Sequence, residues 1–302
     1  MNILEQIKKG PTVKPPKIML IGVEGVGKST AGAQMPDPVF MCSESGLVGP
    51  QFDGIPNYTP TKWQDALDFC DALAAGGHAY ETLVIDTLDW LEPMLYAEVV
   101  RKAGKQDIKN IEDFGYGKGY VLAQGEARQL IARLDKVNAA GLNVLLLSHS
   151  QQKTVKNPLG DDYDHFESKM NAKVGGIFKE WADAVLFARF EVFTEKSNNR
   201  VKAYGGSTRV VETTHSAAWD AKNRYGLPEQ MPLDMAVILN AMKNGNGGDA
   251  KALEIEIKGL CERLPKDKAD KTLAWLSKPR AVIDLRNTLN KIKQTIKEAD
   301  NG

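Results

Sequence analysis

The amino-acid sequence predicts an α/β fold: a doubly wound, mainly parallel sheet with antiparallel strands at one edge and a small helical module at the C-terminus. Through residues 17–148, short apolar runs alternate with segments of helical spacing, which is the order of a parallel sheet with crossover helices. From about residue 184 the apolar runs are short and closely spaced, which indicates antiparallel strands. Residues 251–302 again show helical spacing, with Leu285, Leu289, Ile292 and Ile296 on one face.

Each element has its own local signal. Parallel strands are predicted from the apolar runs at residues 17–21, 39–42, 82–86 and 143–148. Helices are predicted between them at residues 29–35, 63–73 and 121–139, because apolar residues recur there at helical spacing and proline or glycine follows. Edge strands are predicted at 184–193, 200–204, 208–214 and 218–222, two of them separated by Gly205 and Gly206, and a helix follows at 233–243.

This pattern divides the chain into four parts. Residues 1–16 form a leader, in which Ile3, Leu4 and Ile7 could line one face of a short helix; a frayed terminus and a segment that docks on a neighbouring subunit both remain open. Residues 17–243 form the core, and residues 244–250, rich in glycine and asparagine, are expected to be a flexible linker. Residues 251–302 carry 12 Lys and Arg against 8 Asp and Glu, which fits a module that contacts DNA or docks a partner, and equally a solvated helical cap.

Composition limits the class of protein. The 302 residues carry 39 basic and 39 acidic side chains, so any contact with nucleic acid must come from local loops rather than from overall charge. Cys42, Cys70 and Cys261 are far apart and indicate reduced thiols. Neither a signal peptide nor a run long enough to cross a membrane is evident. We therefore expect a soluble, cytoplasmic protein without a membrane partner.

One loop carries the strongest functional signal. It fits the pattern G-x-x-x-x-G-K-[ST], follows an apolar strand and precedes a helix, which is the order of a phosphate-binding loop. Its glycines let backbone N–H groups surround a phosphate chain, and the helix N-terminus favours negative charge. Lys28 can reach the β- and γ-phosphates of ATP, and the Ser29 hydroxyl can bind Mg²⁺. The nucleotide-binding residues predicted here are Gly22, Val23, Glu24, Gly25, Val26, Gly27, Lys28, Ser29 and Thr30.

Three polar residues follow the ends of other predicted strands. Asp86 ends the strand at 82–86, where a carboxylate can hold Mg²⁺ opposite the phosphate loop. Asp86 is followed by Thr87 and not by an acid, which counts against an ATPase of the AAA+ type, where the catalytic glutamate comes directly next. Glu44 is then the best candidate to orient the attacking water, because parallel strands open on one edge. His149 ends a third strand and could sense the γ-phosphate, although a plain loop histidine is the alternative.

A pair of cations near residue 223 suggests a contact between subunits. Lys222 and Arg224 alternate, so on an extended segment they point the same way. Such a pair suits cations that are inserted into a neighbour's nucleotide site, like an arginine finger. An exposed basic strand end is the alternative.

Together these residues resemble the RecA-type recombination and helicase ATPases over roughly residues 17–240. The Lys222 and Arg224 pair is similar to the K-x-R finger of DnaB-type helicases and KaiC-type ATPases, which acts in trans between subunits. The short chain and early phosphate loop resemble most the phage RecA-like, single-strand-annealing recombinases of the Sak group. The resemblance implies a RecA-like fold, Glu44 as the catalytic glutamate and Asp86 as the Mg²⁺-linked acid; His149 stands where many relatives have glutamine.

By the same resemblance, DNA would contact two loops. The loop at 101–120 has a net charge of +2 and interleaves aromatic residues with glycines, which suits base stacking and phosphate neutralisation; an ordinary flexible loop is the alternative. The loop at 151–173 is long and unpatterned, and its acids balance its lysines. The DNA-binding residues predicted on these loops are Lys102, Lys105, Lys109, Tyr116, Lys118, Tyr120, Lys153 and Lys156.

The sequence therefore predicts an ATPase that uses ATP and Mg²⁺ and binds single-stranded DNA. We expect it to promote annealing or strand exchange in phage DNA recombination, in the cytoplasm of a bacterial host. Its partners would be copies of itself, in a ring or filament with nucleotide sites completed in trans, and a single-strand-binding protein is a candidate. The alternatives are a KaiC-like regulatory ATPase that acts on proteins, a DnaB-like helicase motor and a P-loop kinase of small molecules. Hydrolysis that is stimulated by DNA would separate the recombinase from the KaiC-like ATPase.

Overall fold

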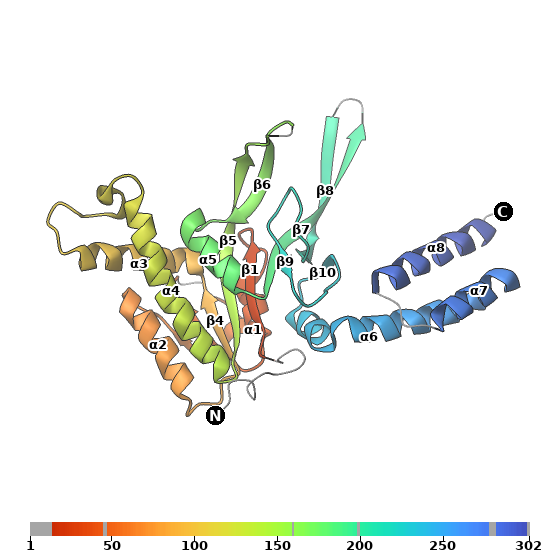
Figure 1. Cartoon of the computed structure of the whole chain (residues 1–302), viewed down its shortest axis with the longest axis horizontal. Coiled ribbons are helices and arrows are strands. Elements are labelled where there is room, and N and C mark those ends of the chain that lie inside the picture. Colours follow the sequence, from red (N-terminus) through yellow and green to blue (C-terminus); the bar gives the residue numbers. More distant parts are fainter. Residues whose placement is uncertain (1–13, 45–46, 159, 198–199, 278–281, 301–302) are drawn as a thin grey trace, which may run out of the picture. The chain divides into compact units, whose positions relative to one another are not determined.

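The computed structural model describes residues 14–44, 47–158, 160–197, 200–277 and 282–300. Ten strands among these residues form one sheet, in the order β10-β8-β7-β1-β5-β4-β2-β3, with β6 paired to β5 and β9 paired to β7 (Figure 1). Its parallel part contains β1 (Lys17–Gly22), β2 (Pro38–Cys42), β3 (Asn57–Tyr58), β4 (Thr82–Asp86), the first half of β5 (Asn143–Val155) and the start of β7 (Ala184–Ser197). The predicted α/β class with a mainly parallel sheet is confirmed.

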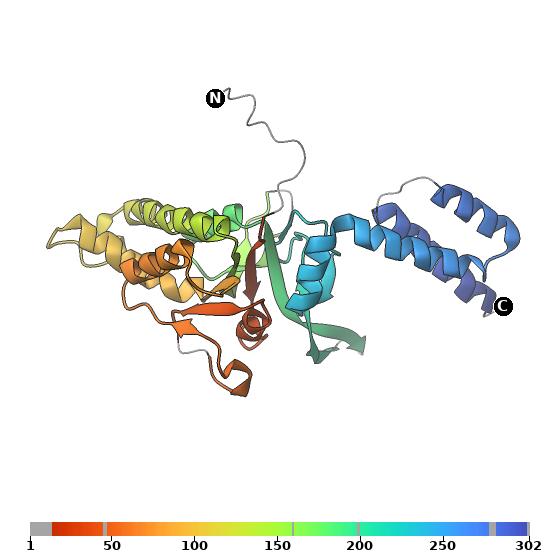
Figure 2. The ribbon, with the colours of Figure 1, turned by 90° about the horizontal axis from the view of Figure 1, so that it is seen from below.

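Helices cover both faces of the parallel strands, as the apolar runs require. On one face, α2 (Trp63–Ala75), α3 (Leu88–Ala103), α4 (Lys118–Ala139) and α5 (Ala172–Trp181) share a continuous core with alternate strand residues such as Met19 and Ile21 (Figure 2). On the other face lies α1 (Lys28–Ala33), where Gly32 packs directly against Phe40 and Val84. Short 3₁₀ turns at Pro50–Phe52 and Ile111–Phe114 complete the connections. The α4 helix begins at Lys118, three residues before the predicted start of 121.

The antiparallel edge is one long hairpin. Strand β7 pairs with β8 (Arg200–Glu212), and β8 pairs with β10 (Gln230–Pro232), while β9 (Lys222–Asn223) pairs with the start of β7. Gly205 and Gly206 do not separate two strands, as the sequence suggested, but lie inside β8. Gly205 faces Val192 across a register shift in β7, and its φ of 106° together with an absent side chain permits this close approach.

The region at 151–173 was expected to be a long loop without pattern, and this expectation is wrong. Strand β5 continues past its buried half to Val155 and turns back as β6 (Tyr163–Ser168), so most of the region is an antiparallel hairpin. The sequence lacks a clear signal because this hairpin is largely exposed on both faces, and its residues therefore show no alternation of apolar and polar side chains.

The C-terminal part is helical, as predicted. It contains α6 (Met235–Cys261), α7 (Lys266–Leu276) and α8 (Val282–Asp300), and its own core includes Leu285, Leu289, Ile292 and Ile296. Residues 244–250 are not a linker between helices but lie within α6. Each glycine makes a helix about 1 kcal/mol less favourable than alanine would, but it does not forbid the helix. A helix can therefore continue through such residues when the turns before and after them are stable.

Contacts divide the chain into two compact units. One unit consists of Met1–Asn223 and Glu229–Met235, and the other of Arg224–Pro228 and Ala236–Gly302. The boundary therefore falls near the start of α6 and not at 244–250.

The predicted leader helix with Ile3, Leu4 and Ile7 lies outside the described residues. None of the helices among the described residues combines the length and apolarity that a membrane span requires.

Candidate functional site

The glycine-rich loop connects β1 to α1 at the centre of the sheet. Strand β1 lies between β5 and β7, and β4 lies on the far side of β5, so one strand separates the loop from Asp86. Gly22 has no room for a side chain, because a Cβ atom would lie 2.9 Å from the Ala188 carbonyl oxygen. Gly27 has a φ of 100° and directly precedes α1. The loop thus has the tight turn that the phosphate-binding pattern requires.

Lys28 is a buried cation at the beginning of α1. Its Nζ donates hydrogen bonds to the carbonyl oxygens of Gly22 at 3.2 Å and Val23 at 3.0 Å, and its residue is 6% exposed. Burial lowers the pKa of the Lys28 ammonium, and the negative charge of Asp86 opposes this shift. An ammonium that is held in a partly desolvated loop interacts more strongly with an added phosphate than an exposed one does.

Asp86 is positioned to hold a metal ion. Burial raises the pKa of this carboxyl group, whereas the Ser29 hydroxyl and the Lys28 charge lower it. Its Oδ2 atom is buried and finds no hydrogen-bond partner among the described residues. The same residues contain no group of three or more His, Cys, Asp and Glu side chains that could hold a metal. One carboxylate and one hydroxyl suit Mg²⁺, which keeps several waters and takes its other ligands from substrate phosphates. Asp86 and Ser29 therefore fit Mg²⁺.

Glu44 reaches the same edge of the sheet because β2 and β4 are neighbours. Cys42 pairs with Asp86, and the Ser43 N–H donates to the Asp86 carbonyl oxygen at 2.9 Å. The Ser43 hydroxyl donates to the Thr87 carbonyl oxygen at 2.7 Å and accepts from the Thr87 N–H at 2.9 Å. These three bonds fix the backbone directly before Glu44.

The electrostatic surroundings of Glu44 connect it to the other predicted residues. Burial raises the pKa of its carboxyl group, His149 lowers it, and Asp86 raises it. Lys28 acts on it as well, so the structure brings together Lys28, Glu44, Asp86 and His149. A carboxylate whose pKa is raised is a stronger base, which is the property required to orient and activate water.

Asp89 is a member of this cluster that sequence reasoning missed. It lies in the first turn of α3 with its side chain 5% exposed, and its two carboxylate oxygens accept from the His149 N–H at 2.9 Å and contact the ring Nδ1 at 2.8 Å. Burial alone would raise the pKa of Asp89, but the hydrogen bonds from His149 outweigh it and leave the pKa lowered. An acid three positions after Asp86 was the available signal, but it equally suits the N-terminus of any helix.

We expect Asp89→Ala to destabilise the core unit by about 1–3 kcal/mol, because the half-buried His149 loses the acceptor of its backbone N–H and the partner of its ring Nδ1. Urea denaturation followed by tryptophan fluorescence measures this change. Asp68→Ala is the matched control, since Asp68 lies on α2 and only accepts an exposed bond from Gln64. Equal unfolding midpoints for the two variants would contradict a structural role for the Asp89–His149 contact.

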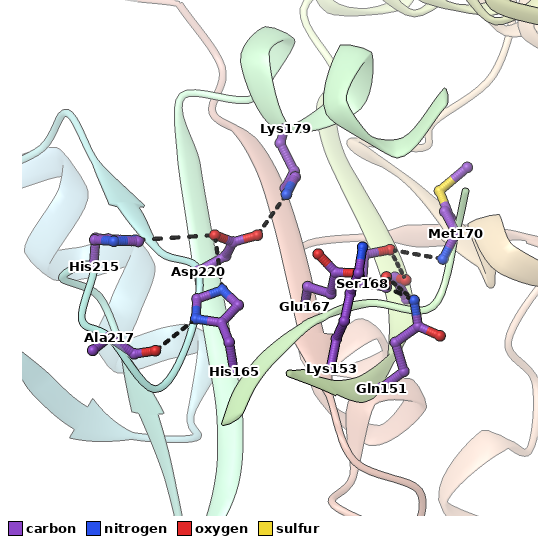
Figure 3. Close-up of polar contacts among 11 residues, drawn as sticks. Gln151, Lys153, His165, Glu167, Ser168, Met170, Lys179, His215, Ala217 and Asp220 are labelled. Atoms are coloured by element: carbon purple, nitrogen blue, oxygen red, sulfur yellow. Dashed lines mark hydrogen bonds and ion pairs between the residues drawn. The ribbon is translucent and has the colours of Figure 1, made fainter. Parts of the chain in front are cut away.

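The base of the hairpin β5–β6 is attached to the edge of the sheet that carries Lys28, Glu44, Asp86 and His149, which we call the nucleotide edge. The hydroxyls of Ser148 and Ser168 lie 2.8 Å apart, and the Lys169 N–H donates to the His149 carbonyl oxygen at 2.8 Å. On the other side of β6, His165 and Lys179 both point toward Asp220 (Figure 3), and the His165 Nε2 atom is 3.2 Å from Asp220 Oδ1. Burial raises the pKa of Asp220, but Lys179 and His165 outweigh this and lower it. The base of the hairpin is therefore held from two sides.

Lys222 is engaged within its own subunit in this structure. Its Nζ donates to the carbonyl oxygens of Lys179, Glu180 and Ala182 at 3.2, 2.7 and 2.6 Å, where α5 ends. The last carbonyls of a helix have no partner within the helix, so a lysine caps them well. Arg224 follows β9 and belongs to the second compact unit. Their role as a finger in trans stays a prediction.

The predicted DNA-binding residues of the first loop fall into two groups. Lys102 belongs to the last turn of α3 and forms ion pairs with Glu126 at 2.7 Å and Glu98 at 3.5 Å. Tyr120 lies on α4 and not on a loop, and its hydroxyl donates to Glu112. The second group extends into solvent, and its three lysines form no ion pair with any described residue. It consists of Lys105, Lys109, Tyr116 and Lys118.

The hairpin lysines are already paired with acids. Lys153 lies 3.4 Å from Glu167, and Lys156 contacts Asp162. Both lysines are exposed, so each ion pair contributes at most about 1 kcal/mol and could be exchanged for a phosphate. Tyr116 is fully exposed and has a φ of 49°, between two glycines that also have positive φ. The most accessible candidate contacts for DNA thus lie between α3 and α4.

Comparison with known proteins agrees with the geometry of the nucleotide edge. The profile of a family described as AAA domain matches residues 14–225, which span the strands, the glycine-rich loop and all of the clustered residues. No curated protein matches the chain. Membership of the family indicates nucleotide binding, usually with Mg²⁺, and nucleotide hydrolysis. The chain belongs to the AAA-domain family of P-loop ATPases.

Proposed function

We propose that this chain is an ATPase that binds single-stranded DNA and promotes its annealing or strand exchange in recombination, as in the Sak group that it resembles. The observation that supports the proposal most is that β5 and α3 each run from the nucleotide edge to a segment that we propose to bind DNA. These segments are the hairpin β5–β6 and the loop between α3 and α4. Strand β5 passes from His149 into the hairpin, and α3 passes from Asp89 toward the exposed loop with Tyr116. A shift of His149 or Asp89 when the γ-phosphate is lost can therefore pass along the backbone of β5 and α3 to both segments.

The chemistry of hydrolysis follows from the clustered residues. Lys28 would bind the β- and γ-phosphates of ATP. Ser29 and Asp86 would hold Mg²⁺, which would supply positive charge that neutralises the phosphates. Glu44 accepts a hydrogen bond from the attacking water and takes up its proton as the water oxygen bonds to the γ-phosphorus. The bond from that phosphorus to the oxygen that bridges the β- and γ-phosphates breaks at the same time, and ADP leaves with the electron pair. Arg224 and Lys222 of a neighbouring subunit stabilise charge on the transferred phosphoryl group, which requires Lys222 to leave the end of α5.

The binding of DNA would use the cations that lack an ion pair. Lys105, Lys109 and Lys118 are exposed without an acidic partner among the described residues, so a DNA phosphate would not have to displace one. Tyr116 is fully exposed beside them and offers a ring on which a base can stack. The hairpin would add Lys153 and Lys156 after its ion pairs open.

The rate of ATP hydrolysis without DNA, with single-stranded DNA and with duplex DNA tests the proposal. Lys28→Ala serves as the blank for contaminating ATPases. Strong stimulation by single strands, together with faster annealing of complementary strands, is the expected result. A rate that DNA leaves unchanged would contradict it and favour the KaiC-like alternative, in which the ATPase acts on protein partners.

We expect Tyr116→Ala to weaken the affinity for single-stranded DNA by about 1–3 kcal/mol, the usual contribution of one stacked base. Fluorescence anisotropy with a labelled oligonucleotide measures it. Tyr58→Ala is the control, because Tyr58 lies on the edge strand β3 and stacks on Phe69 instead. Equal affinities of the Tyr116 variant and the wild type would remove this loop from the DNA site.

A further inference from the structure

Arg209, a residue that none of the sequence motifs includes, lies against the phosphate-binding loop of its own subunit. A Cβ atom built on Gly27 would be 2.8 Å from Arg209 Nη1 and 3.7 Å from its Cζ, so the guanidinium is in contact with the last glycine before Lys28. The two residues are far apart in the sequence. They meet because β8 pairs with β7, and β7 pairs with β1, the strand that leads into the loop.

The position of Arg209 is set by the edge of the sheet. Arg209 pairs with Phe190 across the hairpin, and its backbone carbonyl accepts from the Leu233 N–H at 3.1 Å. The next residue, Val210, is buried, whereas Arg209 is exposed, and adjacent residues of a strand point to opposite faces of the sheet. The side chain is therefore held by a strand that is paired on both sides, and not by a free loop.

The guanidinium has no anionic partner within the described chain. Its one ring contact is with Phe190, whose centroid lies 6.0 Å from Arg209 Cζ, and it forms no ion pair with any described residue. The nearby Arg189 behaves differently, since it binds Glu212 at 2.6 Å and lies over Trp219. Arg209 and Lys28 thus place two cations at Gly27, and the acids that act on the charge of Lys28 include Asp86 and Glu44.

We propose that Arg209 binds the phosphate chain of the nucleotide in cis, as a second cation beside Lys28. Arginine presents several N–H donors in a fixed plane that matches phosphate oxygens, which makes it suited to this contact. The absence of a side chain at Gly27, which its φ of 100° already favours, lets the guanidinium approach the loop. This inference rests on the nucleotide binding within the proposed function and is independent of DNA.

The equilibrium affinity of the full-length protein for a fluorescent ATP analogue, with Mg²⁺ and without DNA, tests the inference. Arg209→Ala is expected to weaken binding about tenfold or more, the usual effect of losing a hydrogen bond between charged groups. Arg209→Lys keeps the charge without the planar fork and should retain part of the affinity. Arg128→Ala is the matched control, because Arg128 is an exposed arginine on α4 and forms no ion pair with any described residue. It should bind as the wild type does.

Competition by inorganic tripolyphosphate separates phosphate contact from contact with the base. If Arg209 touches the phosphates, Arg209→Ala weakens tripolyphosphate and ATP by similar factors. A loss for ATP alone would place Arg209 on the base or the sugar and overturn the inference, as would an Arg209→Ala variant that binds both as the wild type does. In the latter case Lys28→Ala would still lose affinity, so nucleotide binding itself would stand. A wild-type protein that binds neither would overturn both.

Discussion

Replacing Lys28 with alanine is expected to abolish ATP hydrolysis and to weaken nucleotide binding by about 2–5 kcal/mol, which is roughly 30-fold to several thousand-fold. Lys28 is buried at the start of α1, and its ammonium already lies over the loop carbonyls of Gly22 and Val23. Losing it removes a charge-assisted contact in a partly desolvated site, where such contacts are strongest. Titration with a fluorescent ATP analogue and a phosphate-release assay measure the two effects.

The control for Lys28 is Lys17→Ala, on the strand that precedes the glycine-rich loop. Lys17 lies at the opposite end of β1, where its ammonium sits 4.7 Å from the centre of the Trp181 ring and 3.9 Å from Asp135. The Lys17 variant should bind nucleotide as the wild type does. If the Lys28 variant hydrolysed ATP at the wild-type rate after the same purification, the loop would not be the nucleotide site.

The second large effect is expected for Glu44→Gln. This change keeps the shape of the side chain and removes the carboxylate that we assign to the attacking water, so hydrolysis should fall by about 10²- to 10⁴-fold while nucleotide affinity stays close to that of the wild type. Single-turnover hydrolysis with saturating ATP separates the two quantities. A rate within a few-fold of the wild type would transfer the role of base to another acid of the cluster, first of all Asp89.

The pH dependence gives Glu44 a separate signature. Burial raises the pKa of Glu44, so its carboxylate is present above that raised pKa and is lost as the pH falls through it. Hydrolysis by the wild type should therefore fall on the acid side, and the residual activity of Glu44→Gln should lack this limb. The ionised form of a buried acid lowers stability, so the neutral glutamine should leave the folded protein at least as stable at neutral pH. Glu81→Gln, at the opposite end of β4, is the control.

The sequence determined the parts of the protein that local chemistry specifies. The order of apolar strand, glycine loop and helix around Lys28 is a short-range pattern, because every residue in it is fixed by its immediate neighbours. Asp86 at the end of an apolar run was likewise visible, and the parallel arrangement placed Glu44 and His149 on the same edge before any contact was known. The C-terminal helices followed from spacing alone, since Leu285 and Leu289 repeat with the helical period.

Only the tertiary structure decided which distant side chains meet. Asp89 became a partner of His149 because α3 begins directly after β4, beside β5, and Arg209 reached Gly27 because β8 pairs with a strand beside the loop. Lys222 and the hairpin at 151–168 differed from expectation for the same reason: the open carbonyls of α5 and the pairing of β5 with β6 are contacts between segments. Local propensity specifies an element from a few neighbouring residues, whereas these contacts depend on how strands are ordered in the sheet, which no single segment encodes.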